Sequence, residues 1–338
     1  MRGPCAGWST RGRRRPPSEG RGRPGAGDRR AASHPIGARM TAAPAPASTL
    51  DLGGAVLTYL PDGEFRAEPG IAYPTGSDDV LGSGLDVLDA DGMLVLSIGA
   101  VLVTTPRHRV LIDTGIGDRT IALPRPGTTR DAFMRGGGLL QSLAAAGVAP
   151  EEIDAIVLTH LHADHVGWIG SGLDGAQATF PNAEIWVTDA EWSHWTGEEG
   201  AADAVGPRAQ ELALIGPRRR VLVPGTEPIP GITAVDTAGH TPGHVALEVA
   251  GARSRALVLG DAVHCPAELV RPDVVWAGDL DPTSAIRTRH ALRDRLADGE
   301  LIVVGPHFPD AVFRRTGTAT GVEEADAATP RLHLLDAE

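Results

Sequence analysis

Short apolar runs, each ended by polar or turn-forming residues, begin at about residue 50 and predict a series of β-strands. Two longer stretches, residues 139–146 and 283–298, predict helices; Asp281-Pro282 supplies the cap and the first residue of the second. Sheet and helix segments therefore alternate in both halves of the chain, which is typical of an α/β protein. The predicted strands are residues 93–98, 100–104, 109–112, 153–159, 184–188, 232–235, 245–249, 256–259 and 301–304.

The first 39 residues have a different composition from the rest of the chain. They are rich in Arg, Gly and Pro and hold almost no large apolar side chain, so we expect them to be disordered. Arg13-Arg14-Arg15 could begin a twin-arginine export signal, but Pro16-Pro17-Ser18-Glu19 follows where an apolar stretch is required. An equally weighted alternative is that translation begins at Met40.

The pattern divides the chain into three parts. Residues 1–48 are expected to be a disordered tail followed by an Ala/Pro linker over 41–48. Residues 49–316 should form a single catalytic domain, and residues 317–338 a loose C-terminal tail.

Composition and charge narrow the range of functions. The 338 residues are 42% hydrophobic and contain no apolar run long enough to span a bilayer, so no membrane partner is expected. Cys5 and Cys265 make no disulfide framework, which favours the reducing cytoplasm. Residues 1–39 carry a formal charge of +8, so the remainder carries −20 of the total of −12. A body this acidic argues against nucleic acid and favours neutral substrates.

Histidine and aspartate side chains gather where the predicted strands end. His160-Leu161-His162-Ala163-Asp164-His165 places three imidazoles and a carboxylate at the end of strand 153–159. His160 and His162 are two residues apart, so both side chains leave the strand on one face. A chance polar loop is a poor explanation for this spacing.

Three more candidate ligands, His240, Asp261 and His307, each follow another predicted strand. In open α/β sheets, sites collect beyond the carboxyl ends of strands, so all of these groups should meet at one edge. Imidazole and carboxylate without thiolate suit Zn²⁺, Mn²⁺, Co²⁺ or Fe²⁺.

The run from His160 to His165 resembles the HxHxDH signature of the metallo-β-lactamase superfamily. Residues 111–115, 237–244, 260–261 and 305–309 resemble the family's other motifs and follow in the family order over about residues 50–315. The resemblance implies a four-layered αββα sandwich with two divalent metal ions, Zn²⁺ foremost, at one edge. It assigns His160, His162 and His240 to one ion, Asp164, His165 and His307 to the other, and Asp261 as the bridge between them.

Within the superfamily, the sequence is most similar to the quorum-lactone lactonase and methyl parathion hydrolase branch, on residues 260–264, Asp281, Arg289 and 307–309. This branch implies a hydrolase in which a hydroxide between two metals attacks a neutral ester-like bond, in a lactone, carboxyl ester or organophosphate triester. Asp164 is a candidate for carrying the proton to the leaving group. The commonest β-lactamases have Cys where Asp261 stands, which argues against β-lactam hydrolysis.

Two other functions stay open: a mononuclear iron redox enzyme similar to persulfide dioxygenases, and a ligand-sensing module with little turnover. The first uses fewer ligands than this chain offers. A homodimer also stays open.

Several residues near the motifs have two interpretations. His244 follows Pro242 and Gly243, which prevent a helix, so we expect it to support the ligands from behind and His240 to be the ligand. His264 could orient a ligand or a substrate, or be a structural histidine. Trp168, Trp276 and Phe308 could line an apolar substrate pocket, although core packing is as good an explanation for each.

Overall fold

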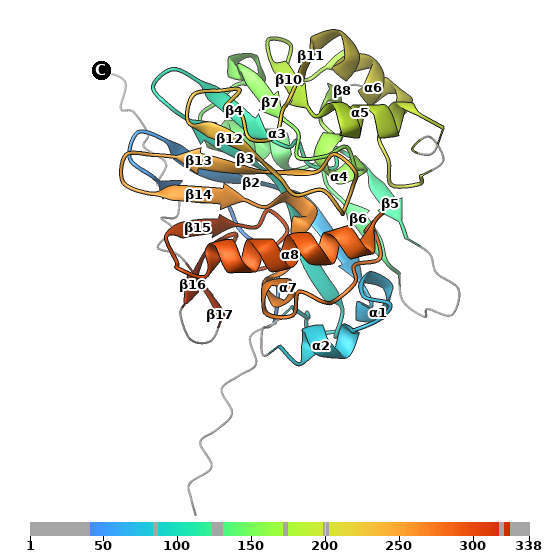
Figure 1. The fold of residues 1–338 in the computed structure, drawn as a ribbon. Helices are drawn as coiled ribbons and strands as arrows, with labels where there is room; N and C mark the ends of the chain where they lie inside the picture. The colour runs from blue at the N-terminus through green and yellow to red at the C-terminus, as the bar shows by residue number, and fades with distance from the viewer. Residues whose placement is uncertain are drawn as a thin grey trace, which may run out of the picture. The chain divides into compact units, whose positions relative to one another are not determined.

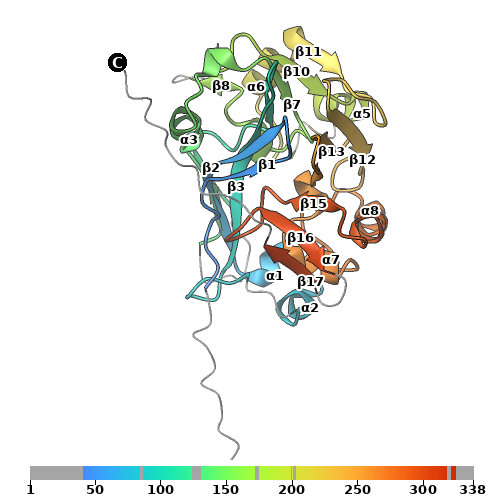
Figure 2. The same ribbon diagram turned by 90° about the vertical axis from the view of Figure 1, so that its left-hand side faces the viewer.

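The two large sheets of the protein lie face to face, with helices on both outer sides (Figures 1 and 2). The computed structural model describes residues 41–83, 87–123, 131–171, 175–198, 200, 203–317 and 321–324, and the predicted disordered segment 1–39 lies outside them.

Most strands of the first sheet come from the N-terminal half of the chain. Its order is β11-β10-β7-β4-β3-β2-β6-β5, with β1 also paired to β2. The strands β4, β7, β10 and β11 run parallel to one another, whereas β3 is antiparallel to both β2 and β4. The bounds are β1 Ser48–Asp51, β2 Val56–Ala67, β3 Leu94–Thr104, β4 Arg109–Ile112, β5 Thr120–Ala122, β6 Phe133–Arg135, β7 Ala155–Val157, β10 Glu184–Val187 and β11 Arg219–Val221.

The second sheet has the order β12-β13-β14-β15-β16-β17. Only the β14 and β15 pair is parallel in its described residues, so β12, β14 and β15 all point the same way. The bounds are β12 Ile232–Asp236, β13 Val245–Ala250, β14 Arg255–Val258, β15 Leu301–Val304, β16 Phe313–Gly317 and β17 Gly321–Glu324. A small separate pair consists of β8 Gly170–Ser171 and β9 Gln177–Ala178.

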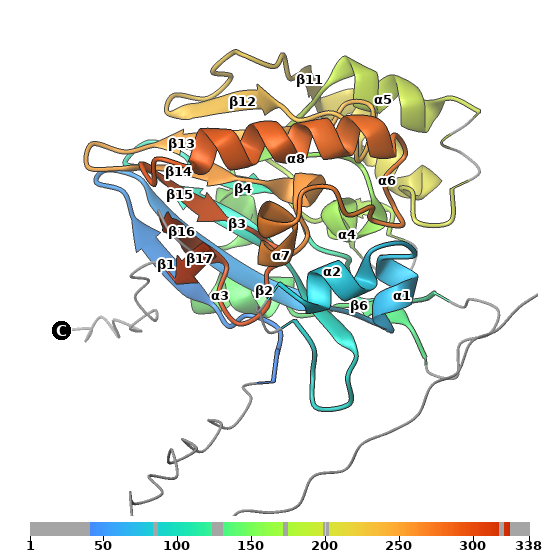
Figure 3. The same ribbon diagram turned by 60° about the horizontal axis from the view of Figure 1, so that its bottom comes forward.

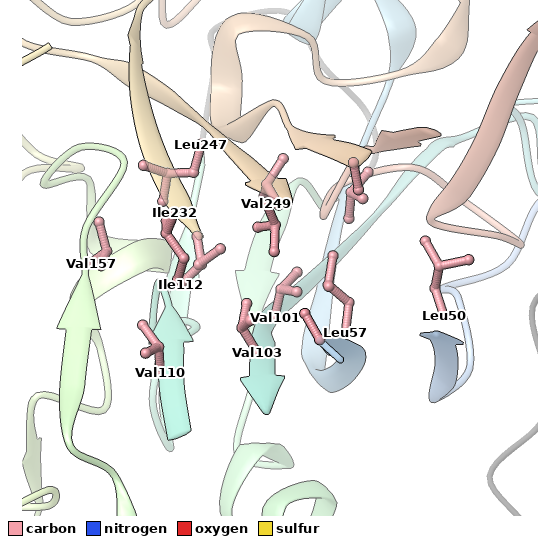
Figure 4. Close-up of a cluster of buried hydrophobic side chains, with 14 of the residues drawn as sticks. Leu50, Leu57, Val101, Val103, Val110, Ile112, Val157, Ile232, Leu247 and Val249 are labelled. Carbon is pink, nitrogen blue, oxygen red and sulfur yellow. The ribbon is translucent and has the colours of Figure 1, made fainter. Parts of the chain in front are cut away.

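Continuous apolar strands such as β4 are explained by burial on both faces. Successive side chains of a strand point to opposite sides. Val110 and Ile112 therefore enter the core between the two sheets, while Leu111 enters the core on the outer side of the first sheet. Figure 4 shows the inner core, where Ile112 of the first sheet faces Ile232 of the second and Val101 faces Val249.

Helices close both outer faces and complete the four layers. In Figure 2, α3 (Leu139–Ala145) covers the first sheet and α8 (Pro282–Leu296) the second. The N-terminus of α8 forms as predicted, since Asp281 accepts a hydrogen bond of 3.0 Å from the Ser284 amide. Figure 3 shows α1, α2 and α7 on one side of the protein. The other helices are α1 Pro69–Ala72, α2 Ser77–Leu81, α4 Ala163–Val166, α5 Asp189–Thr196, α6 Ala209–Ile215 and α7 Pro266–Val270.

The structure differs from the sequence-based expectation at both ends of the domain. Within the expected linker, Ala45 is buried and its amide donates to Ser97 Oγ at 2.8 Å, so this segment packs on the domain. Within the expected C-terminal tail, β17 extends the second sheet by pairing with β16. The remaining tail, residues 325–338, lies outside the described residues.

Strand direction brings the predicted ligands together. The parallel strands β4 and β7 of the first sheet lead to Asp113 and to the motif that begins at His160. The parallel-pointing strands β12, β14 and β15 of the second sheet lead to His240, Asp261 and His307. Because the carboxyl ends of like-directed strands share one edge, these loops converge there.

Candidate metal centre

Two groups of buried histidine and aspartate side chains meet where these loops converge. In each group, the ligand atoms all lie within 4.8 Å of one another. The first group is His160, His162, His240 and Asp261, and the second is Asp164, His165, Asp261 and His307. The structure thus brings together all seven residues that the sequence singled out, and it places Asp261 in both groups.

The atoms of the first group have the spacing of ligands around one ion. His162 Nδ1 lies 3.0 Å from His160 Nε2 and 2.9 Å from His240 Nε2. Asp261 Oδ2 lies 3.4 Å from His240 Nε2 and 3.8 Å from His160 Nε2. Ligands about 2.1 Å from a tetrahedral zinc ion lie about 3.4 Å apart, so this group fits such an ion.

The second group meets the other oxygen of the shared carboxylate. Asp261 Oδ1 lies 2.8 Å from His307 Nε2 and 3.0 Å from His165 Nε2. The Asp164 carboxylate lies 3.7 Å from His165 Nε2 and 3.8 Å from His307 Nε2. Asp261 Oδ1 is buried, yet within the described part of the chain no donor reaches it with hydrogen-bonding geometry. Such an oxygen is costly to bury, and a divalent cation would remove that cost.

The far side of most ligand rings is fixed by a hydrogen bond. Four of the five imidazoles face their group with Nε2 and place Nδ1 against an acceptor, which selects the tautomer whose Nε2 lone pair is free. The Nδ1 contacts are His160 to Thr159 Oγ1 at 3.1 Å, His165 to Asp113 Oδ2 at 2.9 Å, His240 to Asp279 Oδ1 at 3.1 Å and His307 to the Ser97 carbonyl at 2.7 Å. His162 is reversed: its Nδ1 faces the group, and its buried Nε2 has no hydrogen-bond partner among the described residues.

Burial and charge set different protonation in the two groups. Desolvation lowers the pKa of His162 and of His240 to about 3, so both rings are neutral at pH 7 and can bind a cation. Desolvation also acts on His165, but nearby carboxylates, Asp261 foremost, raise the pKa of this ring well above its usual value. An ion entering the second group would therefore displace a proton from His165.

Comparison with known proteins shows the family. Residues 95–307 match the model of the metallo-beta-lactamase superfamily. The chain belongs to this superfamily. It is 26% identical over 224 residues to an N-acyl homoserine lactonase of a Bacillus species, covering 64% of this chain and 82% of that one. It is 28% identical over 245 residues to the probable metallo-hydrolase Rv2300c of Mycobacterium tuberculosis, covering 64% of this chain and 76% of that one.

Solved structures share the fold. The dizinc quorum-quenching lactonase AidC superposes with a TM-score of 0.69 at 23% identity, covering 84% of this chain and 98% of that one. The hydrolase AbOPH gives a TM-score of 0.65 at 26% identity, covering 82% and 96%. The predicted four-layered metallo-β-lactamase fold is confirmed, and the chain is a metal-dependent hydrolase of this superfamily.

A cavity of about 250 Å³ adjoins the two groups of this metallo-β-lactamase domain. Its polar side consists of the ligand residues His162, Asp164, His240, Asp261 and His307 together with His264. Its remaining walls are apolar, with Phe65, Ile71, Leu96, Met134 and Trp276 among them. None of the described residues that line it is an arginine or a lysine.

Two further histidines lie close to Asp261: His244, which the sequence predicted to support the ligands, and His264, for which it left two interpretations. His244 Nδ1 lies 2.8 Å from Thr237 Oγ1, and its Nε2 accepts a hydrogen bond of 2.9 Å from the Asp261 amide. Both of its ring nitrogens thus bond the protein, and neither group includes it. His264 lines the cavity with Nε2 3.3 Å from Asp261 Oδ2, and its ring stacks on Trp276 at 3.9 Å. Burial opposes its charge, but Glu268 and Asp261 raise the pKa of His264 to about 10.

The three aromatic residues suggested for the pocket do not behave alike. Trp276 lines the cavity, as one of the two interpretations held. Trp168 packs in the core of the first sheet's outer face, where its indole donates to Asp62 Oδ1 at 2.8 Å. Phe308 is fully buried in the core beneath α8. For Trp168 and Phe308 the structure corrects the pocket interpretation, because neither is among the described residues that line this cavity and both pack in the core.

Sequence reasoning missed several buried carboxylates that hold the site. Asp62, Glu191, Glu268 and Asp279 are almost inaccessible to solvent and accept hydrogen bonds from neighbouring loops. A lone acidic residue has no spacing pattern to mark it, so only Glu191 carried a signal, the Thr188-x-x-Glu191 pattern of a helix start. Among the described residues, no helix is long and apolar enough to cross a membrane.

Proposed function

We propose that this chain is a dinuclear metallohydrolase that cleaves neutral ester-like bonds, with lactones as the leading substrate class and carboxyl esters and phosphotriesters as the alternatives. The observation that carries the proposal is the pair of ligand groups that share Asp261 beside a cavity with apolar walls. The lactonase named among the relatives supports the substrate class.

The chemistry divides between the ions and the chain. When bound, two divalent ions supply a hydroxide nucleophile near neutral pH and polarise the oxygen of the bond under attack. Asp261 presents one oxygen to each group and so sets their separation. Asp164 belongs to the second group and also lines the cavity, so its carboxylate can take up a proton and deliver it to the leaving oxygen.

The cavity walls favour an uncharged substrate. An anionic group such as a phosphodiester would find no guanidinium among the described lining residues, and the charged His264 ring is already paired with Asp261 and Glu268. Phe65, Leu96 and Met134 instead offer contact to an acyl or aryl group, whose burial stabilises the complex by about 25 cal/mol per Å².

Zn²⁺ is the metal that the nitrogen and oxygen ligands favour, and Mn²⁺, Co²⁺ and Fe²⁺ are alternatives for the same donors. A mononuclear redox enzyme would bind an ion in one group only and would leave the ligand residues of the second group without a metal. Metal analysis of protein purified without chelators separates these two functions, because only the dinuclear enzyme binds two ions per chain.

The substrate class is tested by kcat/KM on the Zn²⁺-loaded full chain. The panel consists of acylated homoserine lactones with short and long chains, a δ-lactone, a p-nitrophenyl ester, a phosphotriester, a phosphodiester and a β-lactam. We expect the best neutral ester to exceed the phosphodiester and the β-lactam by at least about 10-fold, or about 1.4 kcal/mol. Preference for either of those two would overturn the proposal, and kcat/KM near background on all of them would favour the sensing module.

A further inference from the structure

Glu191 is a fully buried carboxylate that no step of the proposed hydrolysis uses. It lies in the first turn of α5, whose cap residue Thr188 accepts a hydrogen bond of 3.2 Å from the Glu191 amide. The helix starts at this cap, but the Glu191 side chain does not turn back to it. It points instead into the protein, where its exposed fraction is 0%.

Each oxygen of Glu191 bonds one of the loops that carry the first ligand group. Oε1 accepts a hydrogen bond of 2.9 Å from the amide of Leu161, the residue between His160 and His162. Oε2 accepts hydrogen bonds of 2.7 Å from Thr241 Oγ1 and 3.0 Å from the Gly243 amide, in the loop that begins with His240. One side chain thus ties together the two segments that supply three imidazoles.

Two further contacts of α5 tighten this connection. Trp195 donates its indole N–H to Glu191 Oε1 at 2.5 Å, and its ring lies edge-on to His162 at 5.2 Å. Thr188 Oγ1 donates to the Gly243 carbonyl at 2.9 Å. A Cβ at Gly243 would come within 2.2 Å of the Glu191 amide, so the loop approaches the helix as closely as only glycine permits.

The second ligand group is held by other residues. His165 bonds Asp113, and His307 bonds the Ser97 carbonyl. The hydrogen bonds that Glu191 accepts all come from Leu161, Thr241, Gly243 and Trp195 among the described residues.

We propose that Glu191 is a positioning residue that sets the geometry, and hence the metal affinity, of the first ligand group alone. This inference rests on the proposed dinuclear site. A glutamine has one acceptor oxygen, so Glu191→Gln would leave the donors of one loop facing an amide NH₂ group. Burial raises the pKa of Glu191 above its usual value, and the hydrogen bonds from its four donors oppose this rise.

The test measures metal affinity without catalysis. Metal-free full-length protein is titrated with Zn²⁺ in competition with a chromogenic chelator, which yields the two dissociation constants. We expect Glu191→Gln to raise the dissociation constant of one ion about 10–100-fold, the usual loss of affinity for a residue behind the ligands. The dissociation constant of the other ion should rise by less than about 3-fold. A merely structural residue would lower the melting temperature without separating the two constants.

Two backgrounds identify the affected site. In His307→Ala, which disables the second group, Glu191→Gln should still weaken the remaining ion about 10–100-fold. In His240→Ala, which disables the first group, Glu191→Gln should change the dissociation constant of the remaining ion by less than about 3-fold. Thr241→Val, which removes a single donor and keeps the side-chain shape, should give a smaller loss at the same site and serves as the test if Glu191→Gln does not fold.

Glu211→Gln is the matched control. Glu211 is also fully buried in the first turn of a helix, α6, but it bonds Arg208 and pairs with Arg119 at 3.3 Å. Its loss should leave the affinity of the first site unchanged. Equal weakening of both ions by Glu191→Gln, or of neither, would overturn the inference and leave the dinuclear function standing. If the wild type binds one ion, the dinuclear function fails, and the role of Glu191 stands only if that ion is lost in His240→Ala and weakened in Glu191→Gln.

Discussion

The carboxylate of Asp62 accepts hydrogen bonds from three segments, one of which follows Asp113 and another His165, so Asp62→Asn should destabilise the protein strongly. Oδ2 accepts hydrogen bonds from the amides of Ile116 at 2.8 Å and Gly117 at 3.2 Å. Oδ1 accepts from the amides of Gly137 at 3.0 Å and Leu139 at 2.9 Å, and from the Trp168 indole. Five donors therefore depend on one side chain that is 5% exposed.

The size of the effect follows from this division of donors. Asparagine can turn its single oxygen to one side only, so at least the two amides that now bond Oδ2 would face an NH₂ group. Each buried donor left without an acceptor costs about 1–3 kcal/mol, which gives about 2–6 kcal/mol for the substitution. That is a large part of the roughly 5–15 kcal/mol by which a domain is usually stable.

Urea unfolding of metal-free protein, followed by tryptophan fluorescence, measures this difference. Asp154→Asn is the control, because Asp154 accepts one amide hydrogen bond, from Arg109 at 2.8 Å, in an exposed position. The control should lose less than about 1 kcal/mol. A loss below about 1 kcal/mol for Asp62→Asn, with an unchanged m-value, would refute the reasoning that these five bonds are needed for stability.

Other predictions concern the metals and the cavity. Chelation should abolish hydrolysis and lower the melting temperature, since an ion present at 1,000 times its Kd stabilises the native state by about 4.1 kcal/mol; an unchanged melting curve would contradict tight binding. Elemental analysis of His240→Ala should show about one ion fewer, whereas His244→Ala should keep both ions at saturating metal with reduced activity, because His244 holds the Asp261 amide; the reverse pattern would exchange their roles. Trp276→Ala should raise KM for a long-chain lactone about 10-fold or more and that for a short-chain lactone less, and equal effects would exclude Trp276 from acyl binding.

Local patterns predicted the elements whose burial is uniform. The strand at 109–112 and that at 301–304 have the predicted bounds, because both faces of each are covered and the apolar run is uninterrupted. Residues 94–104 form one strand, β3, where two were predicted, because Gly99 continues the ladder opposite Pro61 of β2. The strand β2 itself was missed, since Pro61, Asp62 and Gly63 interrupt its apolar pattern with turn-forming residues.

The candidate ligands could be predicted because one motif of six residues, 160–165, contains four of the seven ligand residues. His240, Asp261 and His307 could be added because each follows a strand, and strand direction then decides which edge they share. Apart from His244, which the turn at Pro242 and Gly243 marked as a supporting residue, the residues behind the ligands could not be found in this way. Asp279 and Arg289 form a fully buried ion pair of 3.2 Å behind His240, but their positions in the sequence show no periodicity that would predict it.

Loops that hold metal ligands must be ordered before an ion can bind well, and ordering a backbone costs about 1–2 kcal/mol per residue. In this chain, buried carboxylates supply much of that order through hydrogen bonds with backbone amides. Asp62 fixes the turn after Asp113, Glu191 joins the loops of His160 and His240, and Asp279 orients the His240 ring. The ligands lie on loops and on the short helix α4, and these hydrogen bonds hold the segments that carry them. Because folding already orders these segments, little of the free energy of metal binding is lost in ordering them, and more of it appears as metal affinity.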